Sequence, residues 1–422
     1  MLRMRLISLS LFVPLLHSAN PQPISELLHR AVLEKHIPGA VIVIQQHGKK
    51  IYEEAAGYAD LEHHRVMKVD DVFMIASSSK PFAATTILTL VDNGKLSLDD
   101  RISKYFPNFQ GASTIRQALC HTSGIIGNDG GPEQLDPIRN FDRSLRNAVD
   151  LLIHEPLSYA PGERFSYGGA SFCVVGRIAE TVTGMDFDAY MNKVLVKPLA
   201  LKDTVYRTTR EDLLKRVAVL YRQKDGGFQK MKAVMEPPGR PGPRAGGFIL
   251  VPGGIYSTAN DAITFLQMHL NGGTYHGKRI LSEASVAEMR KKQTGKLANA
   301  YGLGWMRTKV APDGTALEVS HGGAYGTELF VDTERDLVGD PDADAAGRSE
   351  AVYHGDSPCE LFNSSPPWNR LSLVRDEPKL VPRGAPVIDG RMSRDCSMLS
   401  SSAQGTLPGT GSLLLPSTGY LR

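Results

Sequence analysis

The sequence predicts an α+β protein, with an antiparallel sheet flanked by helices and a mainly helical region beside it. Two apolar segments near the N-terminus predict strands at 39–46 and 50–57, which His47-Gly48-Lys49 joins as the turn of a hairpin. A long middle portion has helical periodicity, and further strands are expected only after residue 300. Because early and late strands bracket the helices, we expect the first and last segments to share one sheet.

The helices are predicted from the spacing of apolar residues and from capping signals. In the first, Ile24, Leu27 and Leu28 recur at helical spacing. The last begins at Thr258, where Asp261 completes a cap. The helices that we expect cover 24–36, 77–91, 115–120, 145–153, 170–182 and the segment after Thr258.

The later strands and the loops follow from apolar runs and from glycine and proline content. Strands are expected at 301–305, 317–320 and 327–332, with another beginning at Leu337. Two segments with many glycines and prolines, 128–143 and 222–247, are predicted to be loops.

The composition is that of an ordinary globular protein. Of 422 residues, 41% are hydrophobic and 22% are charged, which excludes a chain that is disordered throughout. The net charge of +3 is too small to predict nucleic acid or an acidic membrane surface as the main partner. A chain of this length can form one large domain or two.

The first nineteen residues have the pattern of a secretory signal peptide. A short basic start, with Arg3 and Arg5, precedes an apolar run at 6–16 and the small residues Ser18 and Ala19. The run is too short to span a membrane, and no other segment is long and apolar enough to do so. We therefore expect a secreted or periplasmic protein. The alternative is a buried N-terminal helix.

The four cysteines do not predict a metal site. Cys120, Cys173, Cys359 and Cys396 are widely spaced and show no C-x-x-C pattern. Cys120 and Cys173 lie in apolar runs, so we expect them to be small core residues rather than a disulfide.

Ser77 and Lys80 form the first motif with chemical content, Ser-x-x-Lys, which Pro81 follows. On a helix the two side chains share a face and can touch. A serine needs a neighbouring base to take its proton, and a lysine can be that base when burial lowers its pKa. The helix N-terminus also offers N–H groups to an oxyanion. One or two such pairs arise by chance in a chain of about 400 residues, so a capping Ser beside a solvated Lys is the alternative.

Two further segments carry side chains that can take part in catalysis. Tyr167 lies in a glycine-flanked turn just before a predicted helix, and His321 lies at the edge of a predicted strand. Gly322 and Gly323 follow His321 and would let a ligand approach the backbone. Read alone, Tyr167 is more often a packed aromatic residue, and His321 is more often a surface or core histidine.

Taken in order, these motifs resemble those of the serine β-lactamase-like family, which includes class C β-lactamases, D-Ala-D-Ala carboxypeptidases and esterases of that fold. Ser77 and Lys80 match its first motif, Tyr167-Gly168-Gly169 stands in place of Tyr-x-Asn, and His321-Gly322-Gly323 in place of Lys-Thr-Gly or His-x-Gly. Other typical segments include 94–100, 114–124, 161–163, 253–259 and 301–305. The resemblance covers residues 24–339 and implies the β-lactamase/transpeptidase-like fold.

The resemblance also implies roles for the matching residues. Ser77 would form an acyl-enzyme, while Lys80 and Tyr167 share the proton transfers. The N–H groups of Ser77 and Ala324 would hold the oxyanion, and Gly323 and Gly169 would lie on the substrate side. His321 would orient the substrate and tune Tyr167, with a charge change expected at about pH 6–7. No metal or other cofactor is implied.

Two departures from the family pattern affect the prediction. Gly169 replaces an Asn whose amide contacts the acyl-amide of peptide-like and β-lactam ligands, which favours carboxylic esters as substrates. After Gly339, the sequence lacks the pattern of the final strand and helix that the family has. In residues 340–422 the apolar residues show no sustained helical or strand periodicity. We predict a hydrolase domain at 20–339 and a disordered tail at 340–422. A shift of reading frame near codon 340 is our hypothesis for the tail, and a natural appended tail is the alternative.

Three functions remain open from the sequence. The first is a secreted serine hydrolase of esterase type that acts on a small-molecule ester. The second is a β-lactamase or D-Ala-D-Ala carboxypeptidase that acts on amide or peptidoglycan-like substrates. The third, of another class, is a non-catalytic binding protein or an inactive truncated member of the fold. The sequence does not predict an oligomeric state.

Overall fold

The computed structural model describes residues 22–231 and 248–339. All described residues belong to one compact unit. The predicted signal peptide at 1–19 and the predicted tail at 340–422 lie outside the described residues. The domain boundaries, the signal peptide and the tail therefore stay predictions.

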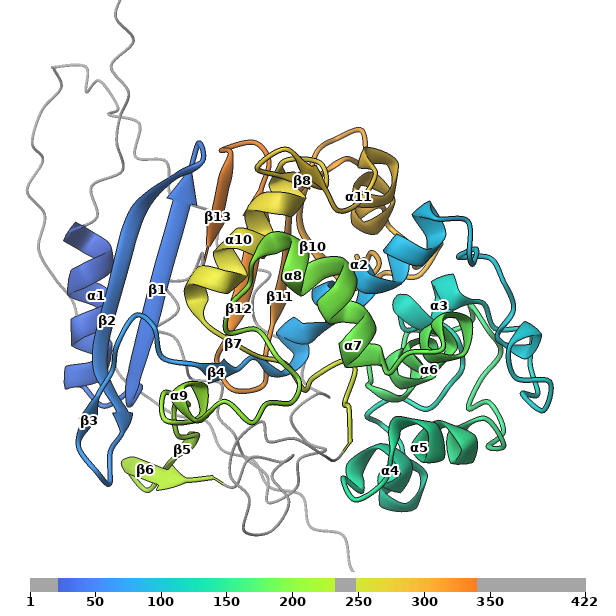
Figure 1. Ribbon diagram of the computed structural model, residues 1–422, viewed down its shortest axis with the longest axis horizontal. Helices are drawn as coiled ribbons and strands as arrows, with labels where there is room; N and C mark the ends of the chain where they lie inside the picture. Colours follow the sequence, from blue (N-terminus) through green and yellow to red (C-terminus); the bar gives the residue numbers. More distant parts are fainter. Residues whose placement is uncertain (1–21, 232–247, 340–422) are drawn as a thin grey trace, which may run out of the picture. The chain divides into compact units, whose positions relative to one another are not determined.

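A seven-stranded antiparallel sheet joins the two ends of the described chain, as the early and late strands predicted. Figure 1 shows the first strands, in blue, beside the last, in orange. The central pair places Ile44 opposite Gly339. The order across the sheet is β10 (Met306–Val310), β11 (Ala316–Gly322), β12 (Glu328–Asp332), β13 (Leu337–Gly339), β1 (Gly39–Gln46), β2 (Lys49–Asp60) and β3 (Arg65–Val66).

The hairpin of β1 and β2 forms where the sequence predicted it. His47 and Gly48 are its two turn residues, and both have positive φ values, 49° and 70°. Two such residues make the turn whose twist matches that of the flanking strands. Alternate side chains of β1 then enter different cores: Ile42 and Ile44 pack with Leu28 of α1 (Gln22–Leu33), whereas Val43 belongs to the main core. At β1 the sheet is thus covered on both faces.

The helices surround the second face of the sheet and form the helical region beyond it (Figure 1). Besides α1, the α-helices are α2 (Ser79–Asp92), α3 (Ile115–Leu119), α4 (Pro132–Arg139), α5 (Leu145–Leu152), α6 (Ala170–Thr183), α7 (Phe187–Met191), α8 (Lys197–Leu199), α9 (Glu211–Leu214), α10 (Ala259–Leu270) and α11 (Glu283–Arg290). Short 3₁₀ turns lie at η1 (Ala76–Ser78) and η2 (Ile102–Lys104), and a π-helical turn at η3 (Asn192–Val196). The antiparallel sheet with helices confirms the predicted fold class.

Helix α2 lies at the centre of the main core. Every residue from Ser79 to Leu90 is buried, which is the signature of a helix enclosed on all sides. Phe82 stacks on Phe265 of α10 with ring centroids 3.7 Å apart and planes 14° apart. Asn93 and the positive φ of Gly94 end the helix where the sequence placed its end.

Two predicted loops contain regular structure, which corrects the sequence-based assignment. Segment 128–143 includes α4, where Pro132 occupies the first turn and Leu135 and Ile138 turn one face into the core. Segment 222–247 begins with the hairpin of β5 (Tyr221–Lys224) and β6 (Gly227–Lys230), whereas its part at 232–247 lies outside the described residues. The other short pairs are β4 (Phe73–Met74) with β7 (Tyr256–Ser257), and β8 (Thr274–Tyr275) with β9 (Lys278–Arg279).

The predicted strand at 301–305 is also wrong. Gly304 has a φ of 74° there, and a Cβ on it would lie 2.9 Å from the carbonyl oxygen of Lys80. The segment therefore bends and packs against α2, and the strand β10 begins only at Met306.

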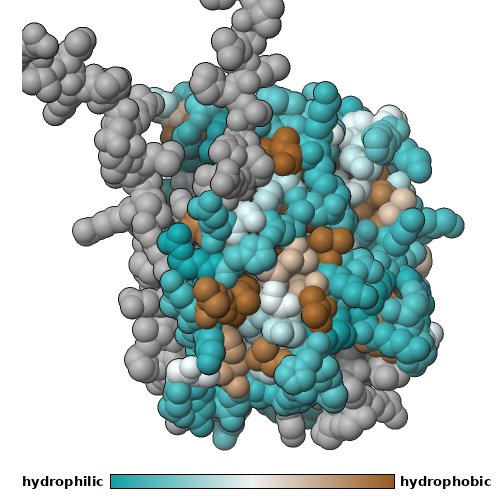
Figure 2. Space-filling view, turned by 90° about the vertical axis from the view of Figure 1, so that its left-hand side faces the viewer, coloured by the Kyte–Doolittle hydropathy of each residue, from teal (hydrophilic) through white to brown (hydrophobic). Residues whose placement is uncertain are grey.

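Cys120 and Cys173 are buried and free, as the sequence predicted. Across the described ranges, no helix combines the length and hydropathy that a bilayer-spanning segment needs. On the face around α1 and β2, Figure 2 shows small hydrophobic groups scattered among hydrophilic residues, which is the pattern of an ordinary protein surface.

Substitution of Phe265 tests how strongly α10 supports α2. We expect Phe265→Ala to lower the free energy of unfolding by about 3–5 kcal/mol, because it removes a fully buried ring and leaves a cavity. Urea denaturation measures this change. Leu33→Ala, at a position that is 82% exposed, is the control and should change stability by no more than about 0.5 kcal/mol. A loss below about 1 kcal/mol in Phe265→Ala would contradict the described packing.

Candidate active site

Ser77 lies in the 3₁₀ turn η1, between the short strand β4 and helix α2. It is partly exposed, whereas its neighbours Ala76 and Ser78 are buried. Ala76 has a φ of 44°, a left-handed conformation that costs a non-glycine residue free energy and that surrounding contacts must hold in place. The turn therefore presents Ser77 at the surface of an otherwise closed core.

Side chains on both sides of Ser77 attach this turn to the rest of the protein. Ser78 Oγ donates to the carbonyl oxygen of His321 at 2.9 Å, and Thr327 Oγ1 donates to that of Ile75 at 2.9 Å. Ser79 Oγ accepts the N–H of Ile255 at 3.2 Å. The nucleophile turn is thus fixed to β11, to the β11–β12 connection and to the segment before β7.

Lys80 places its amine between two hydroxyl groups. Its Nζ atom lies 2.9 Å from Ser77 Oγ and 2.8 Å from Tyr167 Oη, and 3.5 Å from the carbonyl oxygen of Pro252. The residue is only 2% exposed, and this burial lowers the pKa of Lys80 to about 7. An amine in this state can take a proton at neutral pH.

Tyr167 reaches Lys80 from a turn just before α6. The Tyr167 carbonyl oxygen accepts the N–H of Asn128 at 2.8 Å. Gly168 permits this approach, because a Cβ on it would lie 2.7 Å from the Cα of Gly127. Burial raises the pKa of Tyr167 far above its usual value, although a hydrogen bond with Ser77 acts in the opposite direction. The phenol therefore stays protonated at neutral pH, which leaves the amine of Lys80 as the group that can accept a proton.

His321 lies fully buried in β11, behind Tyr167, with the two ring centroids 6.2 Å apart. Its Nδ1 donates to the carbonyl oxygen of Gly322 at 2.9 Å, so its Nε2 accepts the hydroxyl of Tyr301 at 2.9 Å. Burial, and next the charge of Lys80, lower the pKa of His321 to about 3. The prediction that His321 changes its charge at about pH 6–7 is therefore wrong. The sequence placed His321 at a strand edge, whereas the fold buries it. Contact of His321 with substrate stays a prediction.

Gly323 and Ala324 lie beside the nucleophile turn. The N–H of Gly323 donates to the carbonyl oxygen of Thr327 at 2.6 Å. A Cβ on Gly323 would lie 2.3 Å from the carbonyl oxygen of Ile75, so only glycine fits here. This close approach brings Gly323, the residue before Ala324, against Ile75, which directly precedes η1. The donor role of Ala324 stays a prediction.

Gly169 caps α6 at the position where the family has an asparagine. A Cβ on Gly169 would lie 3.2 Å from Pro252 Cγ and 3.5 Å from Ile138 Cδ1. The first distance is tighter than an ordinary van der Waals contact, so a side chain here would require Pro252 to shift by a few tenths of an ångström. The atoms nearest to this position are therefore apolar.

Sequence reasoning missed Tyr301 as part of the site. We assigned Tyr301 to a strand, yet its hydroxyl is the partner of His321 and its ring lies 5.7 Å from that of Phe165. Its motif, with glycines at 302 and 304, was the available signal. Pro252, whose carbonyl oxygen faces Lys80, carried no signal of its own.

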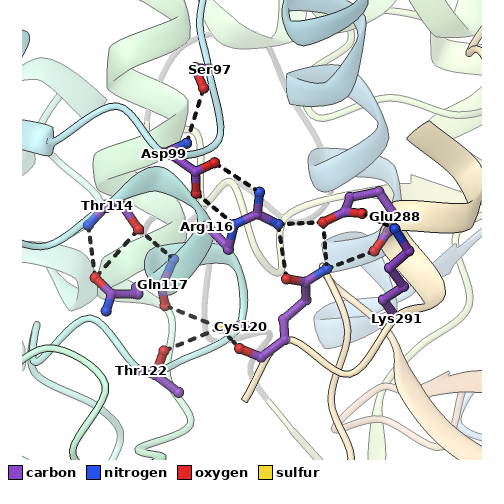
Figure 3. A network of polar contacts seen from close by, with 10 residues as sticks. Ser97, Asp99, Thr114, Arg116, Gln117, Cys120, Thr122, Glu288 and Lys291 are labelled. Carbon is purple, nitrogen blue, oxygen red and sulfur yellow. Dashed lines mark hydrogen bonds and ion pairs between the residues drawn. The ribbon is translucent and has the colours of Figure 1, made fainter. Parts of the chain in front are cut away.

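A polar network around Arg116 leads to the backbone of Tyr301 (Figure 3). Arg116 of α3 pairs with Asp99 at 2.8 Å and with Glu288 of α11 at 2.5 Å, and it donates to Gln293 Oε1 at 3.0 Å. The N–H of Gln293 then donates to the carbonyl oxygen of Tyr301 at 2.8 Å. The network thus connects a surface ion pair to the partner of His321.

Possible metal ligands gather at one place among the described residues, away from Ser77: Asp60, Glu62 and His63. Asp60 and His63 pair with each other at 2.8 Å, and Glu62 pairs with Lys230 at 2.8 Å. Each of these side chains already has a charged or polar partner, and exposed carboxylates commonly cluster without a metal. We therefore assign no metal to them.

The fold and the site together define a class of protein: an antiparallel sheet with helices, and a Ser-x-x-Lys turn beside a tyrosine, in the β-lactamase/transpeptidase-like arrangement. The Beta-lactamase family model matches residues 23–339. The chain belongs to the β-lactamase family, which confirms the resemblance.

Relatives in this family carry different names. The chain is 29% identical to esterase EstB of Burkholderia gladioli over 345 residues, a match that covers 72% of this chain and 85% of the esterase. It is 30% identical to penicillin-binding protein 4 of Amycolatopsis lactamdurans over 344 residues, with 73% and 86% covered. The solved structure of EstCE1, a hydrolase with promiscuous acyltransferase activity, shares the fold at a TM-score of 0.65 and 24% identity, with 75% of this chain and 91% of EstCE1 covered.

Burial of Lys80 has a measurable cost in stability. Between its folded pKa of about 7 and its usual 10.5, the unfolded chain binds a proton at Lys80 that the folded protein does not. Through this group the free energy of unfolding therefore rises with pH, by up to roughly 1.4 kcal/mol per pH unit, and the gain is lost as the pH falls toward 7. Lys80→Met lacks this dependence, so its stability relative to wild type should be greatest near pH 7.

Urea denaturation at several values between about pH 7.5 and pH 9.5 measures this difference. The matched control is Lys95→Met, at an exposed position where no charge is buried. A stability difference between Lys80→Met and wild type that stays constant over this range would show that Lys80 is charged in the folded protein.

Proposed function

We propose that this chain is a secreted serine hydrolase that cleaves carboxylic esters through an acyl-enzyme on Ser77. One observation carries the proposal: the buried amine of Lys80 lies within hydrogen-bond distance of both Ser77 Oγ and Tyr167 Oη. A nucleophile, its base and a second proton carrier are therefore already in contact.

The proposed reaction begins with neutral Lys80, which takes the proton of Ser77 as Oγ attacks the ester carbonyl carbon. The carbonyl oxygen becomes an oxyanion, which the N–H groups of Ser77 and Ala324 stabilise. When the tetrahedral intermediate collapses, the proton passes from Lys80 through the Tyr167 hydroxyl to the leaving alcohol, and the acyl group remains on Ser77.

Water completes the proposed cycle. It attacks the acyl carbon and gives one proton, through the Tyr167 hydroxyl, to Lys80, and a second tetrahedral intermediate forms. Its collapse releases the carboxylic acid, and the proton returns to Ser77 Oγ. Within the protein, each proton therefore passes only through three side chains that are already in contact.

The preference for esters rests on the surroundings of Gly169. An amide substrate presents an N–H and a carbonyl group that need polar partners when they are desolvated. Here the family's asparagine is absent, and the atoms nearest to Gly169 are apolar ones of Pro252 and Ile138. The match to esterase EstB supports the same choice.

Action on cell-wall peptides or β-lactams is the second candidate. The match to penicillin-binding protein 4 favours it, since this relative is as similar to the chain as the esterase is. A binding protein without activity is the third candidate. The contacts of Lys80 speak against it, because a buried amine destabilises a fold that makes no use of it.

Export is part of the proposal and rests on residues 1–19 alone, whose basic start and apolar run are typical of a signal peptide. Cell fractionation, with intact mass of the recovered protein, tests it. Loss of these residues in the exported protein is the expected result.

A fluorophosphonate probe tests whether Ser77 is activated. We expect intact mass spectrometry to show one covalent adduct on wild type and none on Ser77→Ala, since the probe reacts with nucleophilic serines. Ser158→Ala, at an exposed serine, is the matched control and should keep the adduct. A chain that is folded by circular dichroism but forms no adduct would make the binding protein the leading candidate.

Substrate choice and pH dependence test the ester mechanism. Hydrolysis of a short-chain aryl ester should exceed that of a chromogenic cephalosporin in kcat/KM. The ester rate should rise with pH through about 7 and then level, because Lys80 must be neutral to accept the proton of Ser77. Steady-state kinetics measures both. A cephalosporin rate above the ester rate would instead establish the second candidate.

A further inference from the structure

His121 is buried in an unusual position directly behind Tyr167. The residue is 1% exposed, and its backbone has a φ of 61°, a left-handed conformation that non-glycine residues seldom adopt. Aromatic rings enclose its imidazole: that of Tyr167 lies 4.6 Å away between centroids, and those of Phe165, Phe172 and Tyr301 lie within 5.7 Å. The proposed reaction gives this side chain no part.

The network of Figure 3 fixes the residues on both sides of His121. Cys120 Sγ donates to the carbonyl oxygen of Gln293 at 3.6 Å, and it lies 3.2 Å from Thr122 Oγ1. The N–H of Thr122 donates to the carbonyl oxygen of Gln117 at 2.9 Å. These contacts hold the left-handed conformation of His121, which costs free energy by itself.

His121 in turn receives both amides that flank Tyr167. The N–H of Ser166 donates to the His121 carbonyl oxygen at 2.9 Å. The N–H of Gly168 donates to His121 Nδ1 at 3.4 Å, a long but buried hydrogen bond. His121 therefore contacts the backbone on both sides of Tyr167 as well as the Tyr167 ring.

The hydrogen bonds also assign the proton of the imidazole. Because Nδ1 accepts from Gly168, a neutral ring carries its proton on Nε2. Within the described part of the chain Nε2 has no hydrogen-bond partner, and the surrounding aromatic rings can receive its N–H on their faces. Burial holds the pKa of His121 far below its usual range, so the ring stays neutral. Such a group cannot shuttle protons, but it can fix geometry.

We propose that His121 is a positioning residue for Tyr167: it accepts the Gly168 amide and so keeps the Tyr167 hydroxyl against the Lys80 amine. This inference rests on the proposed function, in which Tyr167 carries the proton to the leaving alcohol. Loss of the acceptor would free the Ser166–Gly168 turn, and a displacement of about 1 Å can cost as much as about 100-fold in rate. Substrate binding would change little, because Ser77 and Ala324 keep their places.

Two variants separate the acceptor of His121 from its packing. His121→Asn keeps an acceptor at the position of Nδ1 and tolerates a left-handed backbone, but it loses the ring. His121→Phe keeps the ring and loses the acceptor. If the acceptor matters, ester hydrolysis by His121→Phe should fall about 10-fold or more in kcat with KM within about twofold, while His121→Asn keeps kcat within about threefold.

The opposite ranking, equal loss in both variants, or no loss in either would overturn the proposal and reduce His121 to a packing residue. Circular dichroism verifies that each variant folds. If His121→Phe does not fold, His121→Met, which is flexible and has no nitrogen acceptor, takes its place.

Hydrogen exchange distinguishes failure of this proposal from failure of the proposed function. If wild type hydrolyses no ester and forms no fluorophosphonate adduct, the proposed function is wrong. Amide exchange at Ser166–Gly168 then decides on His121 alone. Faster exchange in His121→Phe than in His121→Asn would support positioning, and equal exchange would overturn it.

Discussion

The enclosed amine of Lys80 is the constraint on which the rest of the structure depends. Burial lowers the pKa of Lys80 to about 7 and so lets it act as a base, which requires the helix that carries it to be covered by its neighbours. The nucleophile turn, the Tyr167 turn and the bend at Gly304 all close around it, and Gly304 makes direct contact with the Lys80 backbone. Burial that would be a defect elsewhere in a protein is here the source of chemical reactivity.

The predicted fold rested on local signals and succeeded where these are sufficient. The hairpin of β1 and β2 follows from two apolar runs and a two-residue turn, so the sequence located it closely. Helix α4 was missed because Gly131, Pro132 and Pro137 gave the segment the composition of a loop. Only the tertiary core, which takes up Leu135 and Ile138, selects the helix, and no local pattern reveals that core.

The sequence predicted which motifs form the site, but it did not predict how deeply their side chains are buried or which residues surround them. Ser77, Lys80 and Tyr167 were predicted because their motifs resemble those of the family, and the structure brings them into contact. The charge of His321 was misjudged because burial depends on distant segments. Tyr301 was taken for a strand residue because alternation with Leu303 and Trp305 imitates the period of a strand, whereas Gly304 bends the chain.

The middle strand of the sheet, β13, is synthesised late. It lies between β12 and β1, so the N-terminal hairpin gains its neighbour only when residues 337–339 have been made. At about 5–20 residues per second, the roughly 290 residues between β1 and β13 take about 15–60 s to synthesise. During that time β1 has an open edge, which is a template for pairing with other chains. Nascent chains of this protein are therefore at risk of aggregation until β13 pairs with β1 and covers this edge.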